Sequence, residues 1–219
     1  MSSSTVLLST AYLPPVPYMF ILINTNRVYI EAHETYRKQT YRNRCVILSA
    51  NGPIPLVIPV IRPKGNHTPI TEVLIDYSTD WPRNHWRAIE SAYRTSAYFE
   101  FIADILHPFY QNRFNSLWEF NGNLLKVIID FLELLVIIDF TSHYQEITPD
   151  GVIDLRNIIS PKVKDPSIVG LASPTPYFQV FEHRFGFTPN LSIIDMLFNE
   201  GLMARELLKI PKDQGKNNT

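Results

Sequence analysis

The chain has 219 residues, 45% of them hydrophobic, and a formal net charge of -1. This length and apolar content are sufficient for one packed core, and the near-zero charge excludes a general affinity for nucleic acid, which depends on a large cationic excess. Cys45 is the only cysteine, so neither an intrachain disulfide nor a cysteine-based zinc site can form, and a reducing compartment fits. We expect one domain over residues 1–210 and a disordered polar tail over residues 211–219.

Two apolar segments raise the question of membrane insertion. Residues 1–23 lack a positively charged start and are interrupted by three prolines, which is not typical of a signal peptide. Residues 127–138 are too few to span a bilayer and include Asp130 and Glu133. We interpret both segments as core, and we expect a cytoplasmic protein without membrane insertion.

The first third of the chain has strand patterns. Residues 6–8 form an apolar run typical of a short buried strand. Residues 18–23 are apolar on every side, which favours a buried helix after Pro17, with a second strand as the alternative. Residues 27–31 then predict a strand, so the chain opens with a βαβ-like unit.

A hairpin is predicted next. Residues 44–49 and 54–61 are rich in Val, Ile and Leu, and Asn51-Gly52 between them suits a tight turn. Prolines 53 and 55 indicate that the second strand lies at an edge or begins late, because proline cannot donate to the ladder. A further strand is predicted over residues 70–76.

The hydrophobic period then changes to that of helices. Trp86, Ile89 and Tyr93 share one face of a helix that Thr79 or Asp80 could cap, with Pro82 in its first turn. A second helix covers residues 98–109, and Pro108 should kink it or end it near His107. A third covers residues 117–135.

The last third begins with an irregular segment over residues 140–176, interpreted as a functional loop or lid, or as a wrapping segment. Ser192 and Asp195 read as a capping box for a helix that ends at Gly201, followed by a helical turn or two over residues 202–208. Together the elements predict an α/β domain, with a mixed sheet from the N-terminal third covered by helices from the middle and C-terminal parts.

The densest group of cations and aromatics lies in residues 27–52. This combination suits an anionic ligand, because Arg and Lys bind phosphate or carboxylate and Tyr offers a flat face with a polar tip. The alternative is a solvated surface loop whose charges pair locally. The acids Glu31 and Glu34 are too few to neutralise the stretch, whose cations are Arg27, Arg37, Lys38, Arg42 and Arg44.

Common catalytic motifs are absent from the sequence: it contains no phosphate-binding glycine loop, no paired metal-binding histidines and no nucleophile elbow. We therefore predict neither a metal site nor a cofactor. His85, between Trp81 and Trp86, is the candidate general base, since nearby cations favour its neutral form; the alternative is a histidine with a structural hydrogen bond. Asp195 is either an acid or a helix cap, and Cys45 is interpreted as a core residue.

Several stretches together resemble the WbqC-like family of bacterial proteins, which are associated with surface-polysaccharide and O-antigen gene clusters. The stretches are LLSTAYLPPVPYM near the start, ETYRKQTYRNRCVILSAN, WPRNHWRAIESAYRTSAYFEF, and PYFQVF with NLSIIDMLFNEG near the end. The resemblance extends to about Leu208, and the first two stretches are similar to a short form found in Bacteroidota. Many relatives carry a glutamine–proline pair where this chain has Thr10 and Ala11. The residues that match the recurrent pattern are Tyr12, Pro14, Tyr36, Lys38, Asn43, Arg44, Trp81, His85, Tyr93, Gln179, Ser192 and Asp195.

The resemblance implies a role in surface-glycan biosynthesis, as a transferase acting on an activated sugar or its acyl group. We expect an anionic donor, a nucleotide sugar or an acyl donor, at the basic stretch. The expected ligand-binding residues are Tyr12, Tyr36, Lys38, Asn43, Arg44 and Gln179. Two other classes stay open: a non-catalytic partner of another protein, favoured by 11 Tyr and 3 Trp, and a carbohydrate-binding module with stacking aromatics.

Overall fold

The computed structural model describes residues 5–162 and 175–210, and the predicted tail over residues 211–219 lies outside them. The chain opens with β1 (Thr5–Leu8), α1 (Val16–Ile23) and β2 (Arg27–Ile30). β1 and β2 pair in parallel, so the predicted βαβ unit and the helix within it are confirmed. Pro17 lies in the first turn of α1, where its missing N–H costs nothing, and Asn24 ends the helix by donating from Nδ2 to the Phe20 carbonyl.

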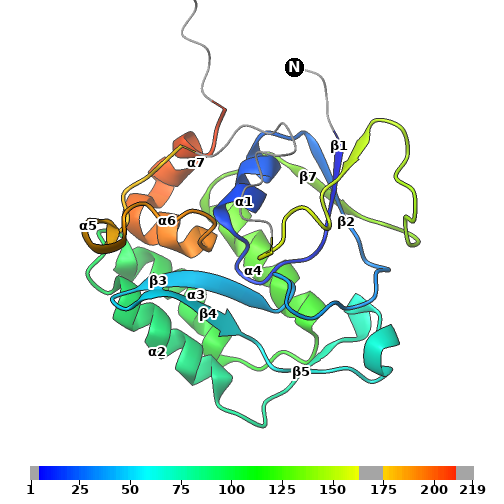
Figure 1. Ribbon diagram of the computed structural model, residues 1–219, viewed down its shortest axis with the longest axis horizontal. Coiled ribbons are helices and arrows are strands. Elements are labelled where there is room, and N and C mark those ends of the chain that lie inside the picture. Colours follow the sequence, from blue (N-terminus) through cyan, green and yellow to red (C-terminus); the bar gives the residue numbers. More distant parts are fainter. Residues whose placement is uncertain (1–4, 163–174, 211–219) are drawn as a thin grey trace, which may run out of the picture.

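The main sheet has four parallel strands in the order β7-β2-β1-β8 (Figure 1). β7 (Ile137–Phe140) pairs with β2, and β8 (Val152–Asp154) pairs with β1. The α/β class is confirmed. The prediction of an irregular segment over residues 140–176 is wrong at β8, because a three-residue strand has too little periodicity to be recognised and depends on a distant partner. The rest of that prediction falls partly on residues 163–174, outside the described part.

The predicted hairpin forms a separate antiparallel sheet of β3 (Arg44–Ser49) and β4 (Gly52–Val57). Ser49 pairs with Gly52, so the turn residues are Ala50 and Asn51, and the prediction of an Asn51-Gly52 turn is wrong by one position. Gly52 begins the strand with φ of 104°, a conformation in which a side chain would be strained. The prolines of β4 are tolerated because each strand of a two-stranded sheet is an edge.

A second small sheet joins β5 (Val60–Ile61) to β6 (Leu74–Ile75). The predicted second hairpin strand therefore ends at Val57, and the predicted strand over residues 70–76 is confirmed only at its end. Before β6, residues Ile70–Glu72 form a 3-10 turn. Pro69 precedes that turn and the Tyr36 N–H donates to the Thr68 carbonyl, so this segment bonds to the loop after β2 instead of extending a sheet.

Three helices follow: α2 (Trp81–Tyr93), α3 (Phe99–Gln111) and α4 (Leu117–Phe131). Asp80 precedes α2, but its side chain makes no capping hydrogen bond. α3 includes Pro108 and continues to Gln111. The alternative that Pro108 ends this helix near His107 is therefore wrong. α4 ends four residues earlier than predicted, because Glu133 takes φ of 51° and turns the chain, leaving Leu135 fully exposed.

The C-terminal part contains α5 (Glu182–Phe185), α6 (Ile193–Glu200), the 3-10 turn Gly201–Met203 and α7 (Ala204–Leu207). Ser192 caps α6 by accepting from the Ile194 N–H, and α6 ends at Gly201 as predicted. The predicted capping box is wrong, however. The Asp195 carboxylate accepts from the hydroxyls of Tyr93 and Tyr177, both at 2.8 Å.

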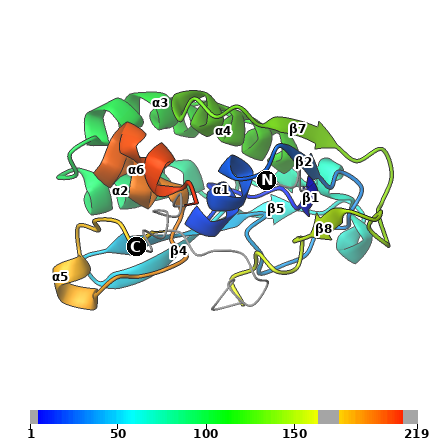
Figure 2. The ribbon, with the colours of Figure 1, turned by 90° about the horizontal axis from the view of Figure 1, so that it is seen from above.

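The elements enclose one continuous core. Figure 2 shows α3 and α4 along one side, the β3-β4 hairpin on the other, and α1 and α6 between them. Val6, Leu8, Val28 and Ile30 alternate along β1 and β2 and are all buried in this core. No helix in the described residues is long and apolar enough to cross a membrane.

Candidate ligand site at the carboxyl edge of the parallel sheet

The order of the strands creates a switch point beside β1. The chain leaves β1 through α1 and returns on one side as β2, whereas β8, on the other side, comes from a much later part of the chain. The carboxyl ends of β1 and β8 therefore lie side by side although the two strands are far apart in the chain. In open α/β sheets, the crevice outside the carboxyl ends of the strands at such a point is where ligands bind.

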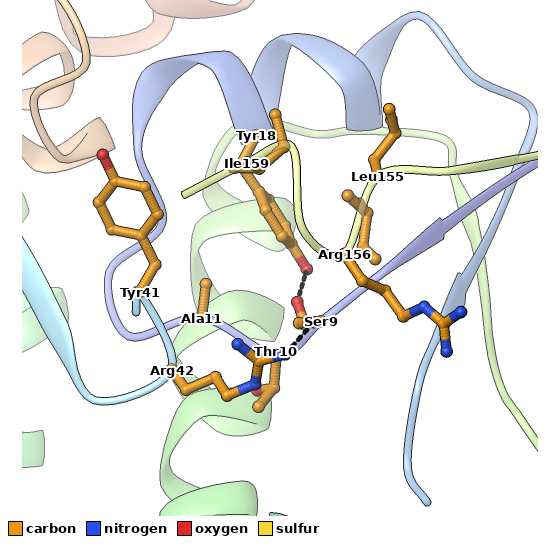
Figure 3. A pocket seen from close by; sticks show the side chains of 10 residues that line it. Ser9, Thr10, Ala11, Tyr18, Tyr41, Arg42, Leu155, Arg156 and Ile159 are labelled. Carbon is orange, nitrogen blue, oxygen red and sulfur yellow. Dashed lines mark hydrogen bonds between the residues drawn. The ribbon is translucent and has the colours of Figure 1, made fainter. Parts of the chain in front are cut away.

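A small pocket lies at this point (Figure 3). Its cavity volume is about 10 Å³, which is room for about one water molecule. Ser9, Thr10 and Ala11 follow β1 and line one side, while Leu155 and Arg156 follow β8 and line another. Arg42 reaches the pocket from the loop before β3. Segments that are far apart in sequence thus meet at the carboxyl edge.

A buried ion pair forms one wall of the pocket. Arg42, 3% exposed, donates from Nε to Glu34 Oε1 at 2.8 Å and from Nη2 to Glu34 Oε2. Nη2 also donates to Ser9 Oγ at 2.7 Å, and Ser9 Oγ donates to Glu34 Oε2 at 3.1 Å. Figure 3 shows the hydrogen bond between Arg42 and Ser9 beside the one from the Tyr18 hydroxyl to the Ser9 carbonyl. A bidentate pair of this kind holds both groups in one orientation.

A second buried ion pair lies behind Arg156. Glu31 is fully buried at the end of β2 and accepts from Arg156 Nη1 at 2.9 Å and from Thr141 Oγ1 at 2.6 Å. Arg156 also donates to Asp154 and to the Gln145 carbonyl, so every one of its nitrogens has an acceptor. Burial raises the pKa of Asp154, but the hydrogen bonds from Arg156 outweigh it and lower the pKa. These contacts tie the ends of β2, β7 and β8 together.

Burial raises the pKa of the Tyr36 hydroxyl, and the positive charges of Arg62, Arg42 and Arg44 oppose that rise. We refer to Arg44 and Arg62, whose charges both act on Tyr36, as the cationic cluster. Arg44 Nε is buried and has no hydrogen-bond partner in the part of the chain that the structure describes. Neither Arg44 nor Arg62 pairs with a carboxylate of residues 5–162 and 175–210.

The structure separates the cations of the basic stretch into two groups. Arg27 pairs with Asp139 at 3.1 Å, Arg42 pairs with Glu34, and Arg37 donates to the Asn157 side chain. The side chains of Lys38, which is exposed, and of Arg44 have no acidic partner among the described residues. Local pairing thus occupies Arg27, Arg37 and Arg42, and it leaves Lys38 and Arg44 as the cations available to a ligand.

Two predicted ligand contacts have structural partners instead. Asn43 is buried, and its Nδ2 donates to the Ile58 carbonyl at 2.8 Å while its own carbonyl accepts from the Ile58 N–H. Gln179 is fully buried and forms a pair of hydrogen bonds with the backbone of Thr188. These contacts fix loops, and a ligand-binding role for either side chain stays a prediction.

His85 and Tyr12 lie in the core between α2, α3 and the segment after β1. His85 is 6% exposed, with Nδ1 3.0 Å from the Tyr12 hydroxyl, and the ring of Trp81 packs against it edge-on. Burial lowers the pKa of His85 to about 4, and a hydrogen bond with the Val57 backbone opposes this shift. The neutral form is thus favoured by burial and not by cations. The geometry gives His85 a structural contact, and its role as a general base stays a prediction.

Several site residues were missed by sequence reasoning. Ser9 and Thr10 lie in the first of the family-like stretches but were not predicted to bind a ligand, and Arg62 and Arg156 belong to no recognised motif. The polar positions directly after strands β1 and β8 were the available signal. Glu31 and Glu34 were treated as a weak counter-charge, yet each holds a buried arginine. No cluster of three or more His, Cys, Asp or Glu side chains in the described residues could hold a metal ion.

Comparison with known proteins gives a family but no activity. The model of the WbqC-like protein family matches residues 10–160, which include the cationic cluster and all of the pocket lining except Leu8 and Ser9. The uncharacterized protein Rv1507c of Mycobacterium tuberculosis is 29% identical over 221 residues, covering 90% of this chain and 94% of the relative. No solved structure matches.

Proposed function

Because this chain belongs to the WbqC-like protein family, we propose that it is a cytoplasmic transferase-like enzyme of bacterial surface-glycan biosynthesis. In this proposal an activated donor, a nucleotide sugar or an acyl donor, binds through its phosphate groups at the cationic cluster of Arg44 and Arg62. Lys38 would add a further charge from the exposed part of the same loop. The link to glycan biosynthesis is inferred from the resemblance stated above. The anionic nature of the ligand is inferred from the positive charges of Arg44, Arg62 and Lys38.

The observation that carries the proposal is the unpaired guanidinium of Arg44. A buried donor without an acceptor costs roughly 1–3 kcal/mol, more when it is charged, and Arg44 Nε is such a donor in the described residues. A phosphate oxygen would supply the missing acceptor, and a second guanidinium nearby, that of Arg62, would allow more than one oxygen to be bound. The Tyr36 hydroxyl, on which both charges act, could donate a further hydrogen bond.

The location supports the same conclusion. The charge of Arg42, which lines the pocket at the switch point of the parallel sheet, acts on the same Tyr36 hydroxyl as the charges of the cluster. An anion bound by Arg44 and Arg62 would therefore lie next to the crevice in which α/β proteins bind their ligands. The remaining part of a donor could extend from the cluster towards the ends of β1 and β8.

A thermal-shift screen against nucleotides, nucleotide sugars and acyl-coenzyme A compounds tests the proposal. A ligand at 100 times its dissociation constant adds about 2.7 kcal/mol, which is a shift of roughly 5–10 °C for a chain of this size. Arg44→Ala should weaken binding by roughly 1.5–3 kcal/mol, the range of a hydrogen bond to a charged group. Arg87→Ala, an exposed arginine on α2, is the matched control and should leave the shift unchanged.

The screen also separates the competing functions. A shift that Arg44→Ala and Arg87→Ala reduce equally would contradict the assignment of the cluster. No shift with any compound would favour the non-catalytic partner protein, which a stoichiometric pull-down would then identify. Retention on immobilised glycans without any nucleotide binding would favour the carbohydrate-binding module.

A further inference from the structure

The pocket at the switch point contains polar groups that the protein leaves without partners. Arg42 uses Nε and Nη2 for Glu34 and Ser9, while its Nη1 has no acceptor in the described residues. The Thr10 hydroxyl likewise has no hydrogen bond there. Both residues line the pocket and are more than nine-tenths buried, with exposures of 3% and 6%. Both atoms are therefore available to a group that enters the pocket from outside.

The other polar side chains of the pocket wall are already bonded. The Tyr18 hydroxyl donates to the Ser9 carbonyl, and Ser9 Oγ lies between Arg42 and Glu34. Arg156 has acceptors for all its nitrogens, and Figure 3 shows its guanidinium extending away from Ser9. A bound group would therefore meet Arg42 Nη1 and Thr10 Oγ1, which are a donor and a group that can both donate and accept.

The charge of the pocket determines what kind of group fits. The positive charge of Arg42 is neutralised by Glu34, which contacts it through both carboxylate oxygens. An additional anion would gain little there and would be repelled by Glu34. A hydroxyl group is neutral and can accept from Arg42 Nη1 while it donates to Thr10 Oγ1. The small empty space also favours a group of this size.

We propose that this pocket binds a hydroxyl of the saccharide part of the ligand whose anionic part lies at the cluster of Arg44 and Arg62. The inference rests on the proposed function for the anionic part. Arg42 links the two places, since it lines the pocket and its charge acts on Tyr36, as the charges of Arg44 and Arg62 do. The cationic cluster thus supplies affinity, and the pocket distinguishes a sugar-bearing donor from its bare nucleotide.

Titration calorimetry with UDP-glucose and UDP as probes tests the pocket in solution. Thr10→Val removes the hydroxyl at nearly constant volume, and it should weaken UDP-glucose about three- to tenfold, the range of one neutral hydrogen bond, without changing UDP. Thr10→Ser should restore the preference for UDP-glucose. Thr25→Val, a buried threonine after α1 and outside the pocket lining, should change neither affinity. An equal loss for both probes, or no loss, would overturn the assignment.

Crystals soaked separately in D-glucose and in sulfate test the same assignment without any nucleotide. We expect a sugar hydroxyl within hydrogen-bond distance of Arg42 Nη1 and Thr10 Oγ1, and sulfate beside Arg44 and Arg62. An empty pocket in the glucose soak, or sulfate inside the pocket, would refute the pocket assignment. Glucose in the pocket without sulfate at Arg44 and Arg62 would instead count against the proposed function alone.

Discussion

The side chains of Tyr12 and His85, 73 residues apart in the chain, meet in the core with 3.0 Å between the Tyr12 hydroxyl and His85 Nδ1. The same hydroxyl lies 2.8 Å from that of Tyr110, so one tyrosine joins the segment after β1 to both α2 and α3. The rings of Tyr12 and His85 are also stacked, with centroids 5.8 Å apart. This contact holds the segment from which Ser9 and Thr10 reach the pocket.

Acid should destabilise the protein through His85. Its pKa is about 4 in the folded state and near 6.5 when unfolded. The unfolded state therefore binds the proton first, and stability present above pH 6.5 is lost as pH falls towards 4. The loss is roughly 3 kcal/mol for this shift. His85→Gln should remove this part of the pH dependence, measured by urea unfolding at pH 7 and 4.5; an unchanged difference between the two pH values would contradict the burial of a neutral histidine.

The titration of Asp195 should change the stability of the protein with pH in the opposite direction. Burial raises its pKa to about 6, although the hydroxyls of Tyr177 and Tyr93 lower it in part. The folded state therefore holds the proton of Asp195 more tightly than the unfolded state does. The stability that protonated Asp195 contributes is fully present below pH 3.8 and is lost as pH rises through 6. Asp195→Asn should therefore gain stability relative to the wild type at pH 7 and lose that advantage at pH 4, as followed by circular dichroism in urea. The same difference at both pH values would show that the carboxyl does not titrate in this range.

Removal of one partner from the Arg42–Glu34 pair should be costly. Glu34→Gln leaves a buried guanidinium without its counter-charge, and we expect a loss of about 3–5 kcal/mol in the free energy of unfolding. The matched control is Glu72→Gln, which removes an exposed pair with Lys64 and should cost at most about 1 kcal/mol. Denaturant unfolding of both variants measures the contrast. Equal small losses would mean that the buried pair contributes no more than the surface pair.

Gly201 should not tolerate a side chain. It has φ of 56°, and a Cβ atom there would lie 2.6 Å from the ring of Tyr98. Gly201→Ala should therefore lower the midpoint of thermal unfolding by several degrees, since backbone strain alone costs roughly 1–3 kcal/mol. Gly122→Ala in α4, where a Cβ would meet nothing within 4 Å, should raise stability by up to about 1 kcal/mol. A neutral Gly201→Ala would show that Tyr98 moves aside without cost.

The features that local forces determine could be predicted from the sequence. The βαβ opening, the hairpin and the cap of α6 at Ser192 were predicted, because proline positions, strand periodicity and a capping hydroxyl act within a few residues. The end of α4 was placed too late because Leu135 continues the helical period, and only the left-handed turn at Glu133 ends the helix. β8 was missed, since its three residues become a strand through pairing with β1.

By itself, the sequence determined the α/β class, most helices and the place of the cationic stretch, since these follow from periodicity, turn residues and composition. The tertiary structure decided which of those cations remain available for a ligand. Arg42 and Arg44 are two residues apart, yet Arg42 is neutralised by Glu34 and Arg44 has no acidic partner among the described residues. The tertiary structure also brought Thr10, Arg42 and Arg156 to one pocket. Both outcomes depend on how β1, β2 and β8 align their carboxyl ends, and long-range pairing of that kind leaves no periodic signal in the chain.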